Sequence, residues 1–155
     1  MMSTRRIVFF DVENSSRAEH VGRVIEYLGL APRSENTKIV AMGNWRVVGH
    51  ETAQLLARSG ADLIHSAPAP RVKDWTDLRI AVQAGLWLGS AMPGDILEIV
   101  TDDQAFDAVG DVAAGHGVQF QRVSHRRLVE SGQVPRSAHA PRPRRRRTAA
   151  PRRRR

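Results

Sequence analysis

The sequence contains no cysteine, which excludes disulfide bridges, thiolate zinc sites and a cysteine nucleophile. It also lacks a long apolar run, since no stretch reaches the ~18 residues that a membrane-spanning helix needs. The apolar residues after Arg5 and Arg6 end at Asp11, too soon for the core of a signal peptide. We therefore expect a soluble, cytoplasmic protein with no membrane contact.

Acidic residues are missing from one end of the chain. The stretch from Ser131 onward holds ten arginines and no acid, whereas Met1–Glu130 carries 14 Lys and Arg against 16 Asp and Glu. The formal charge of +8 therefore resides in the tail. Blocks of like charge repel one another and stay disordered. We predict a folded domain at 1–130 and a disordered Arg/Pro-rich tail at 131–155. The tail is either a solubilising extension or, as we prefer, an arm that contacts nucleic-acid phosphates.

Strand-like and helix-like segments alternate along the first 123 residues. Apolar runs of strand length lie at Ile7–Phe10, Lys38–Met42, Ala61–His65, Asp95–Val100 and Val118–Val123. Between them, apolar residues recur at helical spacing in four segments. This order predicts an α/β domain, a three-layer αβα sandwich on a mainly parallel five-stranded sheet, with the last strand at an edge.

Polar residues and glycines mark the expected ends of the helices. Ser15 and Ser16 are predicted to cap the first helix, and Thr76 the third. Gly29 is predicted to end the first helix. Residues 66–73 contain two prolines and are expected to form a loop.

Aspartates stand where the predicted strands end. Asp11 follows the first strand, Asp102 and Asp103 follow the fourth, and Asp77 opens the third helix. The carboxyl ends of parallel strands share one edge of a sheet, where ligands bind. Carboxylates gathered there repel one another unless a cation lies between them. The pattern therefore favours a site for Mg²⁺ or Mn²⁺.

Each of these acids also has a purely structural interpretation. Asp11 is compatible with an ordinary Asx-turn, and Asp77 with a favourable charge at a helix N-terminus. Asp103 is a candidate N-cap for the fourth helix. Capping explains one of Asp102 and Asp103, but not both, and Asp107 alone reads as a solvated helix residue. Only the combined pattern favours function.

Three short motifs together resemble a known family. Phe10–Asn14 resembles the opening motif of NYN domains, the branch of the PIN-like nuclease superfamily that includes LabA-type proteins. Lys73 with Asp77–Val82 resembles the middle motif, in which an aspartate begins a helix after a lysine. Ile99–Phe106 resembles the third motif. The resemblance spans most of residues 7–123, and the order of motifs and of strands and helices agrees with the family.

The resemblance implies a PIN-like fold and assigns roles to particular residues. The metal-binding, catalytic acids of the family fall on Asp11, Asp77 and Asp103. The polar residue that follows the first strand falls on Asn14. Thr101 takes the hydroxyl position beneath the metal.

The sequence also departs from the family pattern. Ala105 stands where the family usually has its last acid, and Asp102 replaces a glycine. Asp102 or Asp107 is a candidate for the missing metal ligand. The lysine stands one residue further from Asp77 than the pattern has it, which makes Asp74 a rival for the middle position. The apolar run after Asp77 favours Asp77.

The function that follows is a hydrolase, a ribonuclease dependent on Mg²⁺ or Mn²⁺, with a nuclease acting on DNA as the less favoured form. Lys73 and Arg46 are candidates for contacts with the RNA phosphates. The competing hypothesis is an RNA-binding or regulatory module without catalysis, which Ala105 favours. A phosphatase or phosphotransfer domain is disfavoured because the first motif lacks Asp-x-Asp spacing. The expected partner is RNA, and a homodimer is left open.

Overall fold

The computed structural model describes residues 3–13 and 16–130. It is an α/β fold with five parallel strands in the order β3-β2-β1-β4-β5. The predicted α/β class and sheet are confirmed, and every pairing in the described sheet is parallel. Asn14 and the arginine tail at 131–155 lie outside the described residues.

Four of the five predicted strands differ from the observed ones by a single residue at one or both ends, and the third predicted strand has the observed bounds. The strands are β1 (Arg6–Asp11), β2 (Thr37–Gly43), β3 (Ala61–His65), β4 (Ile96–Val100) and β5 (Gln119–Val123). The helices are α1 (Ala18–Leu28), α2 (His50–Arg58), α3 (Trp75–Leu88), α4 (Asp107–Gly115) and α5 (His125–Glu130), with a short 3₁₀ turn η1 (Gln104–Phe106) before α4.

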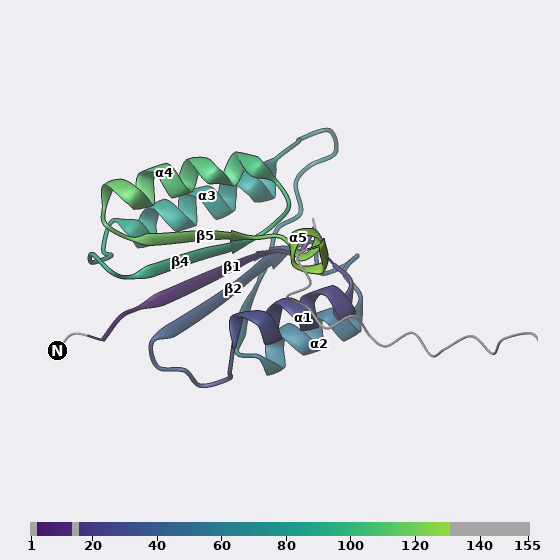
Figure 1. The fold of residues 1–155 in the computed structure, drawn as a ribbon. Helices are drawn as coiled ribbons and strands as arrows, with labels where there is room; N and C mark the ends of the chain where they lie inside the picture. The colour runs from purple at the N-terminus through teal and green to yellow at the C-terminus, as the bar shows by residue number, and fades with distance from the viewer. Residues whose placement is uncertain (1–2, 14–15, 131–155) are drawn as a thin grey trace, which may run out of the picture.

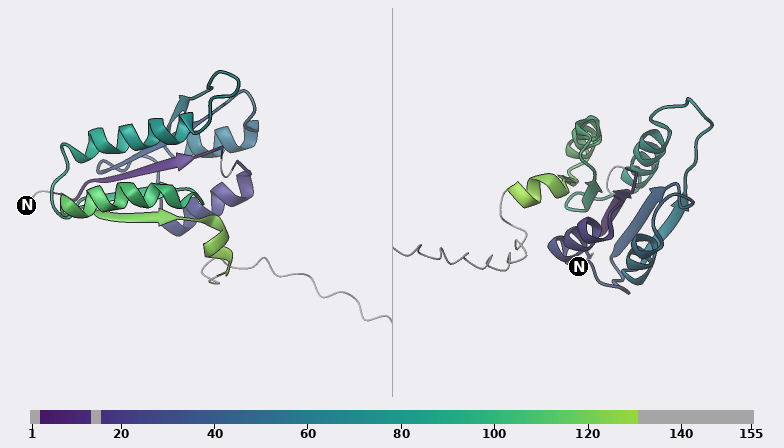
Figure 2. Two further views of the ribbon diagram at one scale, coloured as in Figure 1. Left: turned by 90° about the horizontal axis from the view of Figure 1, so that it is seen from above. Right: turned by 90° about the vertical axis from the view of Figure 1, so that its right-hand side faces the viewer.

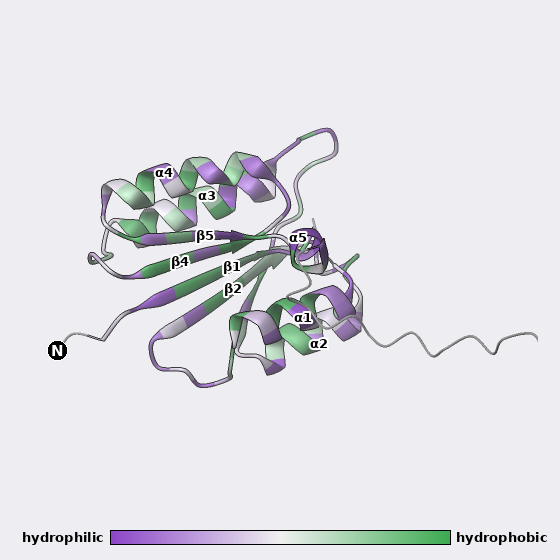
Figure 3. Cartoon of the chain, in the orientation of Figure 1, coloured by the Kyte–Doolittle hydropathy of each residue, from purple (hydrophilic) through white to green (hydrophobic). Residues whose placement is uncertain are grey.

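Helices cover both faces of the sheet, as the sandwich prediction required. Figures 1 and 2 show α3 and α4 over one face and α1 and α2 over the other. Successive side chains of a strand point to opposite faces. Val8 and Phe10 of β1 therefore pack in the core cluster with α1 and α2. Ile7 and Phe9 pack in the cluster with α3 and α4. Figure 3 shows the resulting hydrophobic stretch along the central strands.

Two predicted helix caps are wrong, and one is confirmed. The N-cap of α1 is Arg17 rather than Ser16, and its side chain makes no capping bond; Ser15 lies outside the described residues. Thr76 lies inside α3, where its buried hydroxyl donates to Ser66 Oγ at 2.9 Å. Gly29 ends α1 with φ of 61°, in the left-handed region that favours glycine.

The short helix α5 was not predicted from the sequence. Ser124 precedes it and accepts a hydrogen bond on Oγ from the Arg127 N–H at 3.3 Å, which is the geometry of a serine N-cap. Leu128 is buried in the same core cluster as α1. Figure 1 shows α5 beside α1, at the end of the sheet to which the strand arrows point.

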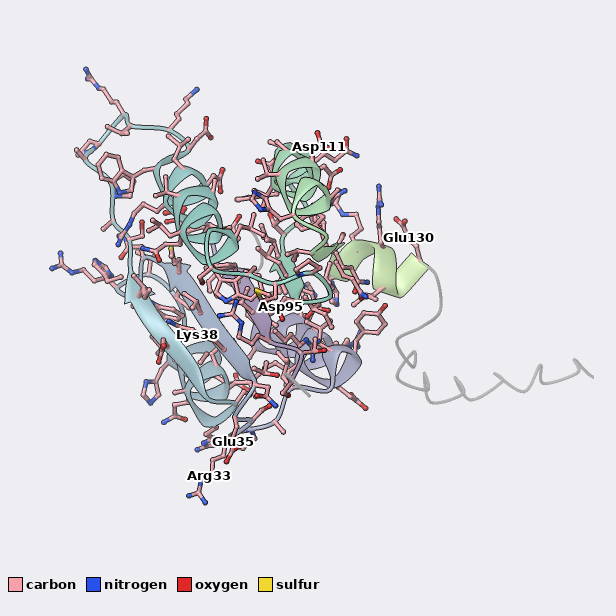
Figure 4. All side chains as sticks on the ribbon, turned by 90° about the vertical axis from the view of Figure 1, so that its left-hand side faces the viewer. Arg33, Glu35, Lys38, Asp95, Asp111 and Glu130 are labelled. Atoms are coloured by element: carbon pink, nitrogen blue, oxygen red, sulfur yellow. The ribbon has the colours of Figure 1, made fainter. Side chains whose placement is uncertain are left out.

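Ion pairs bury charge at the amino edge of the sheet. Asp95 is 4% exposed and accepts hydrogen bonds from Arg5 and from the Met92 N–H, which hold its pKa below the usual value. Arg6 pairs with the buried Glu98 at 2.7 Å. Figure 4 looks onto this edge, with Asp95 near its centre and Glu35 at the periphery. These contacts join the start of β1 to β4.

Candidate functional site

The first candidate residue, Asp11, lies at the point where the strand order reverses. The chain runs outward from β1 to β2 and β3 and then crosses back to β4. In open parallel sheets, ligands bind beyond the carboxyl ends of the strands at such a point. Asp11 is the last residue of β1, and Thr101 directly follows the neighbouring strand β4. Both side chains are buried.

The Thr101 hydroxyl connects Asp11 to the segment that carries Asp103. It donates to Asp11 Oδ2 at 3.2 Å and accepts a hydrogen bond from the Asp103 N–H at 3.1 Å. The predicted hydroxyl position is therefore occupied by a group that fixes the orientation of Asp11. A serine or threonine at this position serves the same purpose, whereas valine does not.

Asp77 reaches the same place from the other side of the crossover. It lies half-buried in the first turn of α3, close enough to Asp11 for its charge to raise the pKa of the Asp11 carboxyl group. The hydrogen bond between Thr76 and Ser66 ties the start of α3 to the end of the preceding strand. Asp103 is close enough for its charge to raise the pKa of Asp77, and the two acids line one pocket.

Burial and mutual repulsion raise the pKa of both carboxyl groups. The pKa of Asp11 rises from 3.8 to about 7, chiefly because the group is buried and then because of the charge on Asp77. Glu13 adds a smaller repulsion, and the Thr101 hydrogen bond opposes the shift. The pKa of Asp77 is also raised, first by burial and then by the charge of Asp103. The two carboxyl groups are close enough to titrate as a pair, and both pKa values lie above that of an ordinary aspartate.

One oxygen of Asp11 is buried without a donor. Among the described residues, Asp11 Oδ1 has no hydrogen-bond partner. Buried polar atoms are nearly always paired, and one that is not calls for an explanation such as a bound ion. Carboxylate oxygens are the ligands that Mg²⁺ and Mn²⁺ prefer.

The acids of the described segments suit an ion that retains much of its hydration. No group of three or more His, Asp or Glu side chains is arranged there to hold a metal. Mg²⁺ keeps several waters and needs only one or two protein carboxylates. Asp11 and Asp77 are the two residues that could hold such an ion.

Asp103 is a cap, as its structural interpretation had it, but of the 3₁₀ turn η1 before α4 rather than of α4 itself, whose N-cap is Phe106. Its Oδ1 accepts the Ala105 N–H at 2.9 Å, which makes it the N-cap of η1. Asp103 thus has one oxygen committed to the backbone. The cap fixes the position of Asp103 relative to Asp77 and Asp11, so a structural role and proximity to the acidic cluster coexist.

The two candidates for an additional metal ligand are engaged elsewhere. Asp102 accepts a hydrogen bond from Ser124 Oγ, just before α5. Asp107 pairs with the Arg122 guanidinium of β5 at 2.9 Å. Other acids supply the charges that raise the two pKa values. Glu13 acts on Asp11, and Asp103 and Asp74 act on Asp77. No residue pattern singled out Glu13 as a functional acid, although it lies within the first motif.

The candidate phosphate contacts lie in loops at the carboxyl edge. Lys73 is exposed in the loop before α3, and Arg46 is exposed in the turn after β2. The Arg46 N–H donates to Asn44 Oδ1 at 3.1 Å. Trp45, next to it, is half-buried and donates from Nε1 to the Ile64 carbonyl at 2.9 Å, so it packs over the sheet edge.

No protein-family model matches the chain, and no curated protein matches it significantly. Within the residues that the structure describes, no helix combines the length and the hydropathy of a membrane span.

Proposed function

We propose that the protein is a metal-dependent ribonuclease whose site is centred on Asp11 and Asp77. The observation that carries this proposal is the buried Asp11 carboxyl group, which has an unpaired oxygen among the described residues, a partner acid in Asp77 and a pKa of about 7. A carboxyl group whose pKa is raised by burial and by a neighbouring acid is typical of functional sites.

The resemblance to NYN domains supports the same proposal. Its three motifs fall at the end of β1, in the first turn of α3 and directly after β4. The residues that correspond to the metal-binding acids of the family, Asp11, Asp77 and Asp103, are thereby coupled electrostatically in the structure. Asn14, at the polar position of the first motif, lies outside the described residues and stays a predicted substrate contact.

The proposed reaction is hydrolysis of a phosphodiester. The oxygen of a water molecule bonds to phosphorus, one P–O ester bond breaks, and the departing oxygen takes a proton, leaving a phosphate monoester and a hydroxyl. A bound Mg²⁺ or Mn²⁺ lowers the pKa of a water and stabilises charge on the phosphoryl oxygens.

Residues of the chain are proposed to hold the ion and to bind the RNA. Asp11 and Asp77 would hold the ion in their ionised forms, and Thr101 fixes the Asp11 carboxyl group through Oδ2. Lys73 and Arg46 are proposed to contact phosphates that flank the scissile one. The arginine tail is proposed to raise the local concentration of RNA through salt-dependent phosphate contacts.

The alternative is an RNA-binding module on the same fold that does not cut. It is favoured by Ala105, which contributes no charge, and by the engagement of Asp102 and Asp107 with Ser124 and Arg122. RNA binding that needs no divalent ion, together with no turnover in Mn²⁺, would support this alternative.

The test is cleavage of single-stranded RNA in the presence of Mg²⁺ or Mn²⁺. Asp11→Asn and Asp77→Asn should each lower the rate at least 100-fold, because each removes a charged oxygen ligand at nearly constant shape. Asp111→Asn is the matched control, since Asp111 is an exposed acid on α4, and it should leave the rate unchanged. Cleavage that survives both substitutions and chelation of the metal would remove the proposal.

A further inference from the structure

A pocket of about 330 Å³ lies between the start of α3 and the η1–α4 segment. Its lining has two parts. Asp74, Asp77 and Asp103 supply carboxylates, and the remaining lining residues, which include Leu78 and Phe106, are apolar. The pocket is therefore continuous with the acidic cluster but differs from it in chemistry.

We infer that this pocket binds a single nucleobase of the substrate, next to the phosphate that the acidic cluster receives. The inference rests on the proposed function and specifies how the substrate lies in that site. Asp77 and Asp103 belong to both the pocket and the cluster. A nucleotide has the matching construction, because its flat ring is joined to its phosphate through one sugar.

The size of the pocket favours a ring over a protein segment. Its volume is at the lower end of the roughly 300–1,000 Å³ range of small-molecule sites. An α-helix with its side chains is about 10–12 Å across and needs a longer groove. One base fits within the measured volume.

Small side chains keep the pocket open. Ala81, Ala105 and Ala108 all line it, and Ala105 and Ala108 are exposed on the η1–α4 side. Ala105 is also the residue that departs from the acidic pattern of the resembled family. A methyl group there leaves an apolar wall beside the acids, where a carboxylate would repel the π-face of a base.

The charge distribution also favours a nucleotide over an apolar peptide. A peptide seated in the pocket would desolvate the three carboxylates without pairing them, which is costly. A nucleotide would place its phosphate at the acidic end, where a divalent cation would pair both partners, and its base against the apolar lining, in which Leu78 is exposed and Phe106 is largely buried. Contacts of a base with apolar and aromatic side chains tolerate different sequences because every base has a π-face.

The test compares the binding of adenosine 5′-monophosphate, uridine 5′-monophosphate and ribose 5-phosphate to the full chain in Mg²⁺, by isothermal titration calorimetry. The three ligands carry the same phosphate, so contacts with the arginine tail cancel in the comparison. We expect both nucleotides to bind about tenfold more tightly than ribose 5-phosphate. Equal affinity for all three would overturn the inference.

Two variants place the difference in this pocket. Ala108→Leu and, separately, Ala105→Leu should abolish the preference for nucleotides and leave the affinity for ribose 5-phosphate within about twofold. Ala114→Leu is the control, since Ala114 is an exposed residue of the same helix that does not line the pocket, and it should keep the preference. A preference that persists in both pocket variants would also overturn the inference.

A failure of the base-pocket inference can be distinguished from a failure of the nuclease proposal. A chain that prefers nucleotides but does not cut RNA loses the proposed catalysis and keeps the base pocket. A chain that cuts RNA but binds all three ligands equally keeps the catalysis and loses the pocket.

Discussion

Replacing Asp11 with asparagine should change how the stability of the protein depends on pH. In the folded chain the pKa of Asp11 is about 7, against 3.8 for an ordinary aspartate. Between these two pH values the folded state keeps a proton that the unfolded state has lost. The free energy of unfolding therefore falls as the pH rises from about 4 to about 7, and it stays lowered above that range.

The size of the effect follows from the two pKa values. Moving the pKa from 3.8 to about 7 corresponds to about 4 kcal/mol at a pH above both values. Because Asp11 is 4% exposed, little of this is lost to solvent screening. The Asn variant cannot ionise, so its stability relative to the wild type should rise by about 4 kcal/mol between pH 4 and pH 8. Any cost of the substitution that does not depend on pH shifts the whole curve by a constant.

The assay is urea unfolding followed by tryptophan fluorescence, in chelator, at half-unit steps from pH 4 to pH 8. Asp111→Asn, at an exposed acid, should run parallel to the wild type. Adding Mg²⁺ at pH 8 should stabilise the wild type more than Asp11→Asn, because the variant has lost one of the two carboxylates that are proposed to hold the ion. Parallel pH profiles for the wild type and Asp11→Asn would refute the reasoning about the buried carboxyl group.

Three further substitutions test residues outside the candidate site. The His125 ring stacks on His20 at 3.8 Å, and burial followed by the charges of His20 and Arg23 lowers its pKa below 6.5. Below pH 6.5 the unfolded chain therefore binds a proton more readily, so stability falls; His125→Phe should flatten this part of the profile in the same urea titration. Gly110→Ala would place a Cβ 2.4 Å from the ring of Phe120 and should cost about 1–3 kcal/mol. Gly115→Ala meets no atom within 4 Å and should cost nothing or stabilise α4, as thermal unfolding would show.

The architecture was largely predictable because apolar runs mark the strands in the sequence. Ile7, Val8, Phe9 and Phe10 are all buried, two on each face, and an uninterrupted apolar run is what a doubly covered central strand requires. The helix α5 was missed because it is only six residues long. Its serine cap at Ser124 was the available signal.

The candidate site was predictable in position but not in detail. Strand ends place Asp11 beside the segment after β4 whatever the side chains do, so the closeness of Asp11 and Thr101 follows from topology. The raised pKa values of Asp11 and Asp77 depend first on burial, which arises only when α3 packs over the sheet. Asp102 and Asp107 interact with Ser124 and Arg122, which lie more than ten residues away in the sequence. No local sequence pattern indicates such contacts.

A crystal structure of the full chain soaked in Mn²⁺, with anomalous diffraction recorded for the metal, tests the central claim most directly. We expect an anomalous peak beside Asp11 Oδ1 and the Asp77 carboxylate. The peak should be absent from crystals of Asp11→Asn. No peak at this place, or peaks only at other acids of the surface, would contradict it.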